Sequence, residues 1–249
     1  MTALVRSELL KIRTTRGWYA YLAVITLLVG VGVAGEVGTA GDQRRSELDF
    51  QLGLVDTAGT AALLAIILGI TVITTEFRHG TVTPTFLVAP HRERVVGAKG
   101  VAGILVSLLF AVLALAVIAA VGLTWLSVVG ADIQLGDGDV GVRAAQMLLM
   151  AVLWALLGVA IGALVQSQVA ALVGTLIWIF LGETLLIGVF GVLNVDGLAS
   201  YLPFQALDAV DGTGGDNLLG YWPGVGVSLA WIAVVGAAGT ERIRRRDIT

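Results

Sequence analysis

The chain has 249 residues, of which 57% are hydrophobic and only 13% are Asp, Glu, Lys or Arg, and its formal net charge is −3. Its mean hydropathy is +0.93. A soluble domain carries about 25% charged residues, so too little of this surface could face water for an ordinary soluble protein. The sequence contains no cysteine, which excludes disulfides, thiolate metal sites and cysteine nucleophiles. We therefore predict an integral membrane protein.

Six apolar stretches are long enough to cross a bilayer core of about 30 Å, which needs about 20 helical residues. The segment Val165–Gln168, with sequence VQSQ, is the one polar break in a long apolar run. It predicts a tight hairpin between the fourth and fifth spans. The predicted spans are about 18–35, 57–75, 100–128, 144–165, 169–190 and 220–240. The predicted fold class is an all-α membrane protein with one transmembrane domain over residues 1–249.

Lys and Arg residues gather on one predicted side of the membrane. Twelve of the fifteen fall there, and an excess of basic residues marks the cytoplasmic side. We therefore expect both termini and the connection between spans two and three to be cytoplasmic. These twelve residues are Arg6, Lys11, Arg13, Arg16, Arg78, Arg92, Arg94, Lys99, Arg242, Arg244, Arg245 and Arg246. The alternative for the first span is a cleaved signal peptide, but its apolar run is longer than usual for one.

The segment before the first span has the pattern of an amphipathic helix. Leu4, Glu8, Leu9 and Ile12 recur at helical spacing beside basic residues. Such a helix lies in the headgroup layer with its apolar side toward the acyl chains. We predict an N-terminal interfacial helix, and the alternative is a solvated basic leader that only sets orientation.

The connection Thr74–Lys99 contains a second short helical pattern. Thr83 and Pro84 form a favourable helix start, and Pro90 disfavours further helix, so a helix of about two turns is expected between Thr83 and Ala89. Its apolar Phe86–Leu87–Val88 patch has charged flanks and suits docking into a groove on another protein. The alternative is a basic loop whose apolar patch rests on the headgroups.

The order of residues in this connection resembles the segment after span two of ATP-binding-cassette type-2 exporter permeases. The stretches "SELLKIRTTRGWY", "LIWIFLGETLL", "YLPFQALDAV" and "RIRRRDIT" are also similar to parts of that family, so the resemblance covers nearly the whole chain. It implies a short cytoplasmic coupling helix that contacts an ATPase subunit. The implied coupling residues are Glu76, Arg78, Gly80, Thr81, Phe86, Leu87, Pro90 and Arg92.

The resemblance also implies partners and a location. The sequence has no G-x-x-x-x-G-K-[ST] phosphate loop, so we expect ATP and magnesium to be bound by a separate ATP-binding-cassette ATPase and no cofactor to be bound by this chain. Permeases of this family pair, as homo- or heterodimers, and we expect a second permease copy in a bacterial plasma membrane, surrounded by lipid. No nucleic-acid partner is expected. Related permeases move drugs, peptides, lipids or ions, so the substrate stays open.

Glu183 is the ionisable residue that lies deepest in an apolar run. One hypothesis makes it a substrate or proton site. The other places it near the outer end of span five, where its carboxylate accepts hydrogen bonds from backbone N–H groups of a re-entrant outer hairpin. Short re-entrant or interfacial helices are expected within Asn194–Tyr221. Arg143 is expected to reach the headgroups or to pair with Asp139.

The predicted function is therefore the transmembrane subunit of an ATP-driven exporter. The main alternative is a secondary transporter or channel that uses Glu183. A membrane enzyme is disfavoured because the sequence places no paired catalytic groups at membrane depth, and both histidines lie in the connection between spans two and three. We expect a non-catalytic chain.

Overall fold

The computed structural model describes residues 2–15, 17–81, 92–134, 138–212 and 219–245, and within these ranges it contains helices and no strand. Six helical stretches are long and apolar enough to cross a membrane, which confirms the prediction of an all-α, multi-pass membrane protein. They are Gly17–Thr39, Leu48–Arg78, Arg92–Val128, Asp139–Val165, Gln168–Val192 and Tyr221–Arg244.

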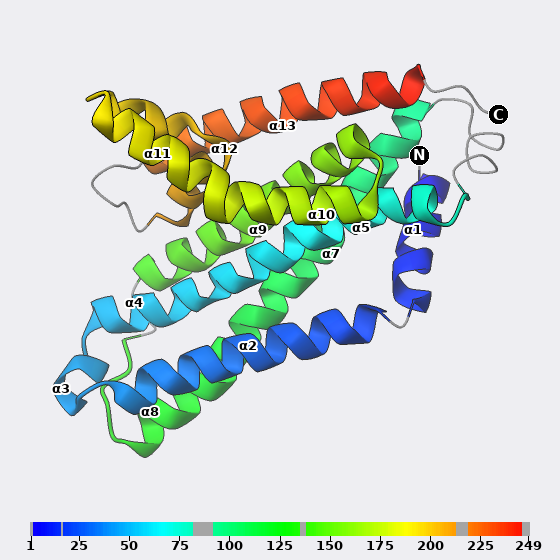
Figure 1. Ribbon diagram of the computed structural model, residues 1–249. Coiled ribbons are helices and arrows are strands. Elements are labelled where there is room, and N and C mark those ends of the chain that lie inside the picture. Colours follow the sequence, from blue (N-terminus) through cyan, green and yellow to red (C-terminus); the bar gives the residue numbers. More distant parts are fainter. Residues whose placement is uncertain (1, 16, 82–91, 135–137, 213–218, 246–249) are drawn as a thin grey trace.

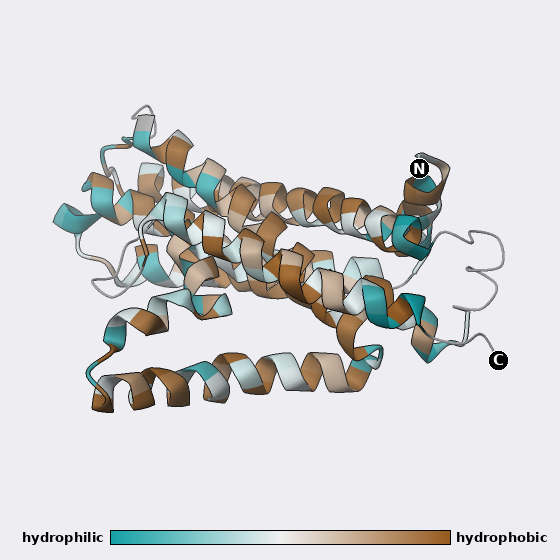
Figure 2. Ribbon diagram, turned by 90° about the horizontal axis from the view of Figure 1, so that it is seen from above, coloured by the Kyte–Doolittle hydropathy of each residue, from teal (hydrophilic) through white to brown (hydrophobic). Residues whose placement is uncertain are grey.

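The helices form an elongated bundle in which α1 (Thr2–Thr14) and the last turn of α13 (Tyr221–Arg244) lie at the same end (Figure 1). We call this the terminal end, and the opposite end the distal end. α1 runs across the bundle axis, whereas α2 (Gly17–Thr39) runs along it (Figure 1). Hydrophobic residues cover the length of the helices, and hydrophilic residues gather toward both ends of the bundle (Figure 2).

The central pair of helices is α5 (Thr60–Arg78) and α9 (Gly138–Val165), which pack on each other along their length. Their glycines allow the two backbones to approach closely. A Cβ added at Gly69 would overlap the carbonyl oxygen of Ala155, and one at Gly158 would overlap that of Ile66. Small residues are the usual means of close helix packing in membranes, because lipid provides no hydrophobic drive for helix association.

Several spans are longer as helices than their hydropathy predicted. The second predicted span, about 57–75, lies inside a helical stretch that begins with α4 (Leu48–Asp56) and passes through η1 (Thr57–Gly59) into α5. Phe50 and Leu54 of α4 are buried, so helix packing continues beyond the part that hydropathy detects. The third span likewise runs from α7 (Arg92–Ile118) through the π-turn η2 (Ala119–Leu123) into α8 (Thr124–Val128).

The break between the fourth and fifth spans falls at the predicted hairpin. α9 ends at Val165, Gln166 has a positive φ of 58°, and α10 (Gln168–Ile177) begins after Ser167. α10 continues through η3 (Trp178–Gly182) into α11 (Glu183–Val192).

Short helices close the distal end. η4 (Asp196–Tyr201), α12 (Pro203–Asp208) and η5 (Ala209–Asp211) follow α11 and precede α13. These elements lie within the segment for which short helices were predicted. α12 and η5 pack against α13 and α9, so this segment is part of the bundle. α3 (Asp42–Arg45) joins α2 to α4 at the same end.

Candidate functional site

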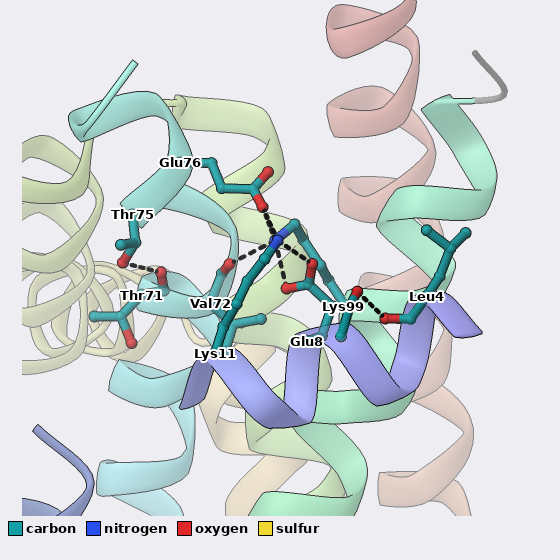
Figure 3. A network of polar contacts seen from close by, with 9 residues as sticks. Leu4, Glu8, Lys11, Thr71, Val72, Thr75, Glu76 and Lys99 are labelled. Atoms are coloured by element: carbon teal, nitrogen blue, oxygen red, sulfur yellow. Dashed lines mark hydrogen bonds and ion pairs between the residues drawn. The ribbon is translucent and has the colours of Figure 1, made fainter. Parts of the chain in front are cut away.

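Four charged side chains form a closed ring at the terminal end (Figure 3). Glu8 of α1 accepts hydrogen bonds from Lys11 and Lys99 with N–O distances of 2.7 Å each. Glu76 of α5 completes the ring, because its Oε1 lies 2.7 Å from Lys11 Nζ and 3.0 Å from Lys99 Nζ. Acidic and basic residues alternate around this ion ring, so the formal charges of its members cancel.

Lys99 lies at the centre of the ion ring and is the most buried of its members. Only 2% of its side chain is exposed, although it carries a charge. Its ammonium group has three N–H donors, and these face Glu8, Glu76 and the carbonyl oxygen of Val72, which is 3.1 Å away. A buried charge is tolerated when it is paired and its donors are satisfied, and Lys99 meets both conditions.

The ion ring attaches α1 to the rest of the bundle. Glu8 is the buried residue of α1. It contacts Lys99 of α7 directly, and Lys11 of α1 contacts Glu76 of α5. Lys11 is half exposed. Burial lowers the pKa of Lys11, but hydrogen bonds to Glu76 and Glu8 and their negative charges raise it more, so its pKa lies above the ordinary value of 10.5. Lys11 therefore stays charged at any physiological pH.

Two arginines connect further helices at this end. Arg92 Nη1 donates to the carbonyl oxygens of Ile243, at 2.6 Å, and Arg244, at 3.2 Å, in the last turn of α13. Arg242 donates to the carbonyl of Leu164 near the end of α9 at 2.7 Å. The last carbonyls of a helix have no intrahelical donor and carry partial negative charge. Each arginine therefore satisfies a helix end and ties it to a neighbour.

The residues that the family resemblance assigned to ATPase coupling lie at different places in the structure. Glu76 is buried in the ion ring, Arg92 binds the end of α13, and Arg78 is exposed and donates to Gln168 Oε1 at 3.3 Å. Gly80, with φ of 68°, and the bond from Thr81 N to the carbonyl of Glu76 close the end of α5. Phe86, Leu87 and Pro90, with the expected helix Thr83–Ala89, lie outside the described residues.

Sequence reasoning did not identify Glu8, Lys11 or Arg242 as members of this site. It placed Glu8 among the apolar positions of the N-terminal helix and gave it no role. A carboxylate on the apolar side of an amphipathic helix requires a buried cation, and that was the available signal. It also placed Lys99 at the end of the connection, just before the third span, whereas Lys99 lies within α7 and is buried.

At the distal end, Glu183 accepts hydrogen bonds from three donors. Its carboxylate oxygens lie 2.8 Å from Phe204 N, 3.2 Å from Gln205 N and 3.3 Å from Trp178 Nε1. Phe204 and Gln205 are in the first turn of α12, whose N–H groups have no intrahelical acceptor. The buried carboxylate thus caps a helix of the distal segment, which is the hydrogen bonding that the structural interpretation of Glu183 predicted.

Two other charged groups lie at the distal segment, Arg143 against it and Asp208 within it. Arg143 Nε lies 3.2 Å from Asp56 Oδ1, and its Nη1 donates to the carbonyl of Asp211 at 2.7 Å. Of the two expectations for Arg143, the pair with Asp139 is wrong, because the Arg143 side chain extends toward α4 and η5. Burial, followed by the charges of Asp211 and Glu183, raises the pKa of Asp208 to about 7.

Two hollows lie beside these groups. One of about 130 Å³ lies beside the ion ring and is walled by Ile12, Trp18, Tyr21 and Leu68. Another of about 390 Å³ lies at the distal end between α2, α4 and α9. Among the described residues, no three His, Asp or Glu side chains are grouped so that they could hold a metal ion.

The chain was also compared with known proteins. No protein-family model matches it, and no curated protein matches it in sequence. Inferences about its function therefore rest on the residues and their geometry.

Proposed function

We propose that this chain is the transmembrane permease subunit of an ATP-binding-cassette exporter. In this proposal it forms the translocation path of a bacterial plasma membrane and pairs with a second permease copy. ATP and magnesium are bound by a separate ATPase subunit, and this chain does not catalyse hydrolysis. Both termini lie in the cytoplasm, α1 lies in the headgroup layer, and the distal hairpin faces outward.

The observation that carries the proposal is the set of contacts around the connection between α5 and α7. Glu76 and Arg78 precede this connection, and Arg92 and Lys99 follow it. Their partners lie on α1, α10 and α13. A push on the connection would therefore act on several spans together, as a permease driven by an external ATPase requires.

Charge distribution supports the same orientation. Basic residues gather at the terminal end, while the described distal loops and helix ends carry mainly Asp and Glu. The positive-inside rule places such a basic end in the cytoplasm, where an ATPase has access to it.

A secondary transporter or channel that uses Glu183 is the alternative. Its central requirement is an intramembrane carboxylate that can exchange a proton or ion. The three donors on Glu183 compete with that role, because each must be released before the carboxylate can bind anything else.

Co-expression with an ATPase encoded beside this chain tests the proposal. We expect a stable complex with two copies of each chain and ATP-dependent transport. Leu87→Asp, in the connection, should abolish co-purification, whereas Leu198→Asp, at an exposed position of the distal end, should leave the complex intact. If Leu87→Asp binds the ATPase normally, or if the chain transports without ATP, the proposal is wrong.

A further inference from the structure

A lateral groove lies between α10 and α13 on the surface of α9. α10 packs on α5 and α9, and α13 packs on α9 and α12, but the two helices are not packed against each other. The groove has a volume of about 340 Å³ and is closed toward the distal end by Pro203 and Phe204. This volume falls in the range of about 300–1,000 Å³ that is typical of small-molecule sites.

The walls of the groove are almost entirely apolar. Three of its lining side chains carry a polar atom: Thr175, Trp178 and Trp231. Both tryptophans have their N–H groups occupied, because Trp178 donates to Glu183 and Trp231 donates to the carbonyl of Tyr201. Thr175 is therefore the side chain of the groove whose donor is unused, and its enclosed Oγ1 reaches a ligand in the groove when the side chain turns about χ1.

The hydroxyl of Thr175 has no hydrogen-bond partner, although only 6% of the residue is exposed. Threonines in membrane helices commonly donate to a carbonyl one turn earlier. Thr74, Thr124 and Thr240 do so here, with distances of 2.7, 2.6 and 2.8 Å. A buried polar group without a partner is unfavourable, so the unused hydroxyl of Thr175 indicates a ligand with a hydrogen-bond acceptor.

The depth of Thr175 restricts the ligand. It lies seven residues after the first residue of α10, or about 10 Å along the helix, so its hydroxyl is roughly a third of the way across a core of about 30 Å. Phospholipids carry their ester oxygens at the boundary of the core, too far away to reach this hydroxyl. The acceptor must belong to a molecule with a polar atom inside an otherwise apolar body.

We propose that this groove is a binding site for lipophilic organic molecules that carry a ketone, amide or ether oxygen, and that Thr175 donates a hydrogen bond to that oxygen. The site needs no partner chain and stands independently of the proposed permease function. If that function also holds, the groove names the chemical class of a transported substrate.

Photolabelling with 4-hexylbenzophenone tests the site, because its ketone is both the acceptor and the reactive group. The full chain is reconstituted in phosphatidylcholine nanodiscs, irradiated with increasing probe, digested and mapped by mass spectrometry. We expect saturable labelling concentrated on peptides of α10 and α13. Thr175→Val should raise the half-saturating concentration by roughly 2- to 12-fold, the effect of one lost hydrogen bond, while Thr175→Ser should remain close to wild type.

Two glycine variants provide a matched control for the groove. Gly174 lines it, and a side chain added there meets no atom within 4 Å, so Gly174→Leu should fold and fill the space. Gly188 of α11 is equally open but does not line the groove. Gly174→Leu should strongly reduce labelling, and Gly188→Leu should leave it unchanged.

Three results would overturn the inference. They are labelling that does not saturate and spreads over all lipid-facing helices, equal half-saturation for wild type and Thr175→Val, and labelling of Gly174→Leu that equals that of wild type. None of these three results depends on the presence of an ATPase subunit. Failure here therefore leaves the permease proposal standing, and loss of the ATPase complex leaves the groove standing.

Discussion

Replacing Lys99 with methionine should detach α1 from the ends of α5 and α7. Methionine has a similar length and no charge, so it removes the centre of the ion ring with little change in volume. The substitution deletes the contacts to Glu8, Glu76 and the Val72 carbonyl, and leaves two carboxylates facing one lysine. The remaining ring then carries a net negative charge in a buried place.

The expected cost is large because the pair is buried. Removing one partner of a buried ion pair costs about 3–5 kcal/mol, and in this size range each kcal/mol lowers the unfolding midpoint by about 2–4 °C. The midpoint of Lys99→Met should therefore fall by roughly 6–20 °C in thermal unfolding of the purified protein in detergent.

A cysteine reporter measures the detachment of α1 itself. Because the chain has no cysteine, Leu9→Cys places a single thiol on the half-buried side of α1. Maleimide should label this thiol faster when Lys99→Met is also present. Arg13→Met is the matched control, since Arg13 is exposed on the same helix and should change neither measurement.

A double variant separates the charge effect from a packing defect. Glu8→Gln combined with Lys99→Met removes one charge of each sign and leaves the pair of Lys11 and Glu76. It should be more stable than the sum of the two single effects predicts, by about 0.5–3 kcal/mol. If the effects simply add, or if Lys99→Met behaves like Arg13→Met, the ion ring does not hold α1 in place.

Three further predictions follow from the distal end and the helix packing. Glu183→Ala should make the distal segment more sensitive to protease because two N–H groups of α12 lose their acceptor, at about 1–3 kcal/mol each. Glu183→Gln should have a smaller effect, because its single amide oxygen can still accept from Phe204 N but its NH2 group cannot accept from Gln205 N; loss of transport in Glu183→Gln with nearly normal protease resistance would favour the proton-site hypothesis instead. The raised pKa of Asp208, about 7 against 3.8, means that its stabilising contribution is complete below about pH 4 and is lost as the pH rises to about 7; the unfolding midpoint should fall over this range, and an equal fall in Asp208→Asn would exclude this origin. Gly69→Ala should strongly destabilise the contact between α5 and α9, whereas Gly32→Ala, where an added Cβ meets nothing within 4 Å, should not; equal midpoints would contradict the close packing.

Hydropathy was enough to find the six membrane helices, because the bilayer thickness sets a length that apolar runs must meet. It could not find their polar contacts. Lys99 meets Glu8 across 91 positions of sequence, and Arg92 meets the Ile243 carbonyl across 151. No local pattern specifies such pairs, since they depend on which helix ends lie together. Glu183 was easier to interpret because the helix that it caps follows 21 residues later.

Burial distinguishes the ion ring from other ion pairs at the terminal end. Arg245 and Glu241 form a pair at 2.6 Å, a shorter distance than any in the ring, but the arginine side chain is 80% exposed. Solvent-exposed pairs contribute about 0–1 kcal/mol, so Glu241→Gln should leave both stability and the position of α1 unchanged. The ring joins three helices through a lysine whose three donors are all used, so no member can move without breaking a buried contact. This coupling, and not the number of charges at the terminal end, makes the ion ring the element through which movement of the connection between α5 and α7 would reach α1.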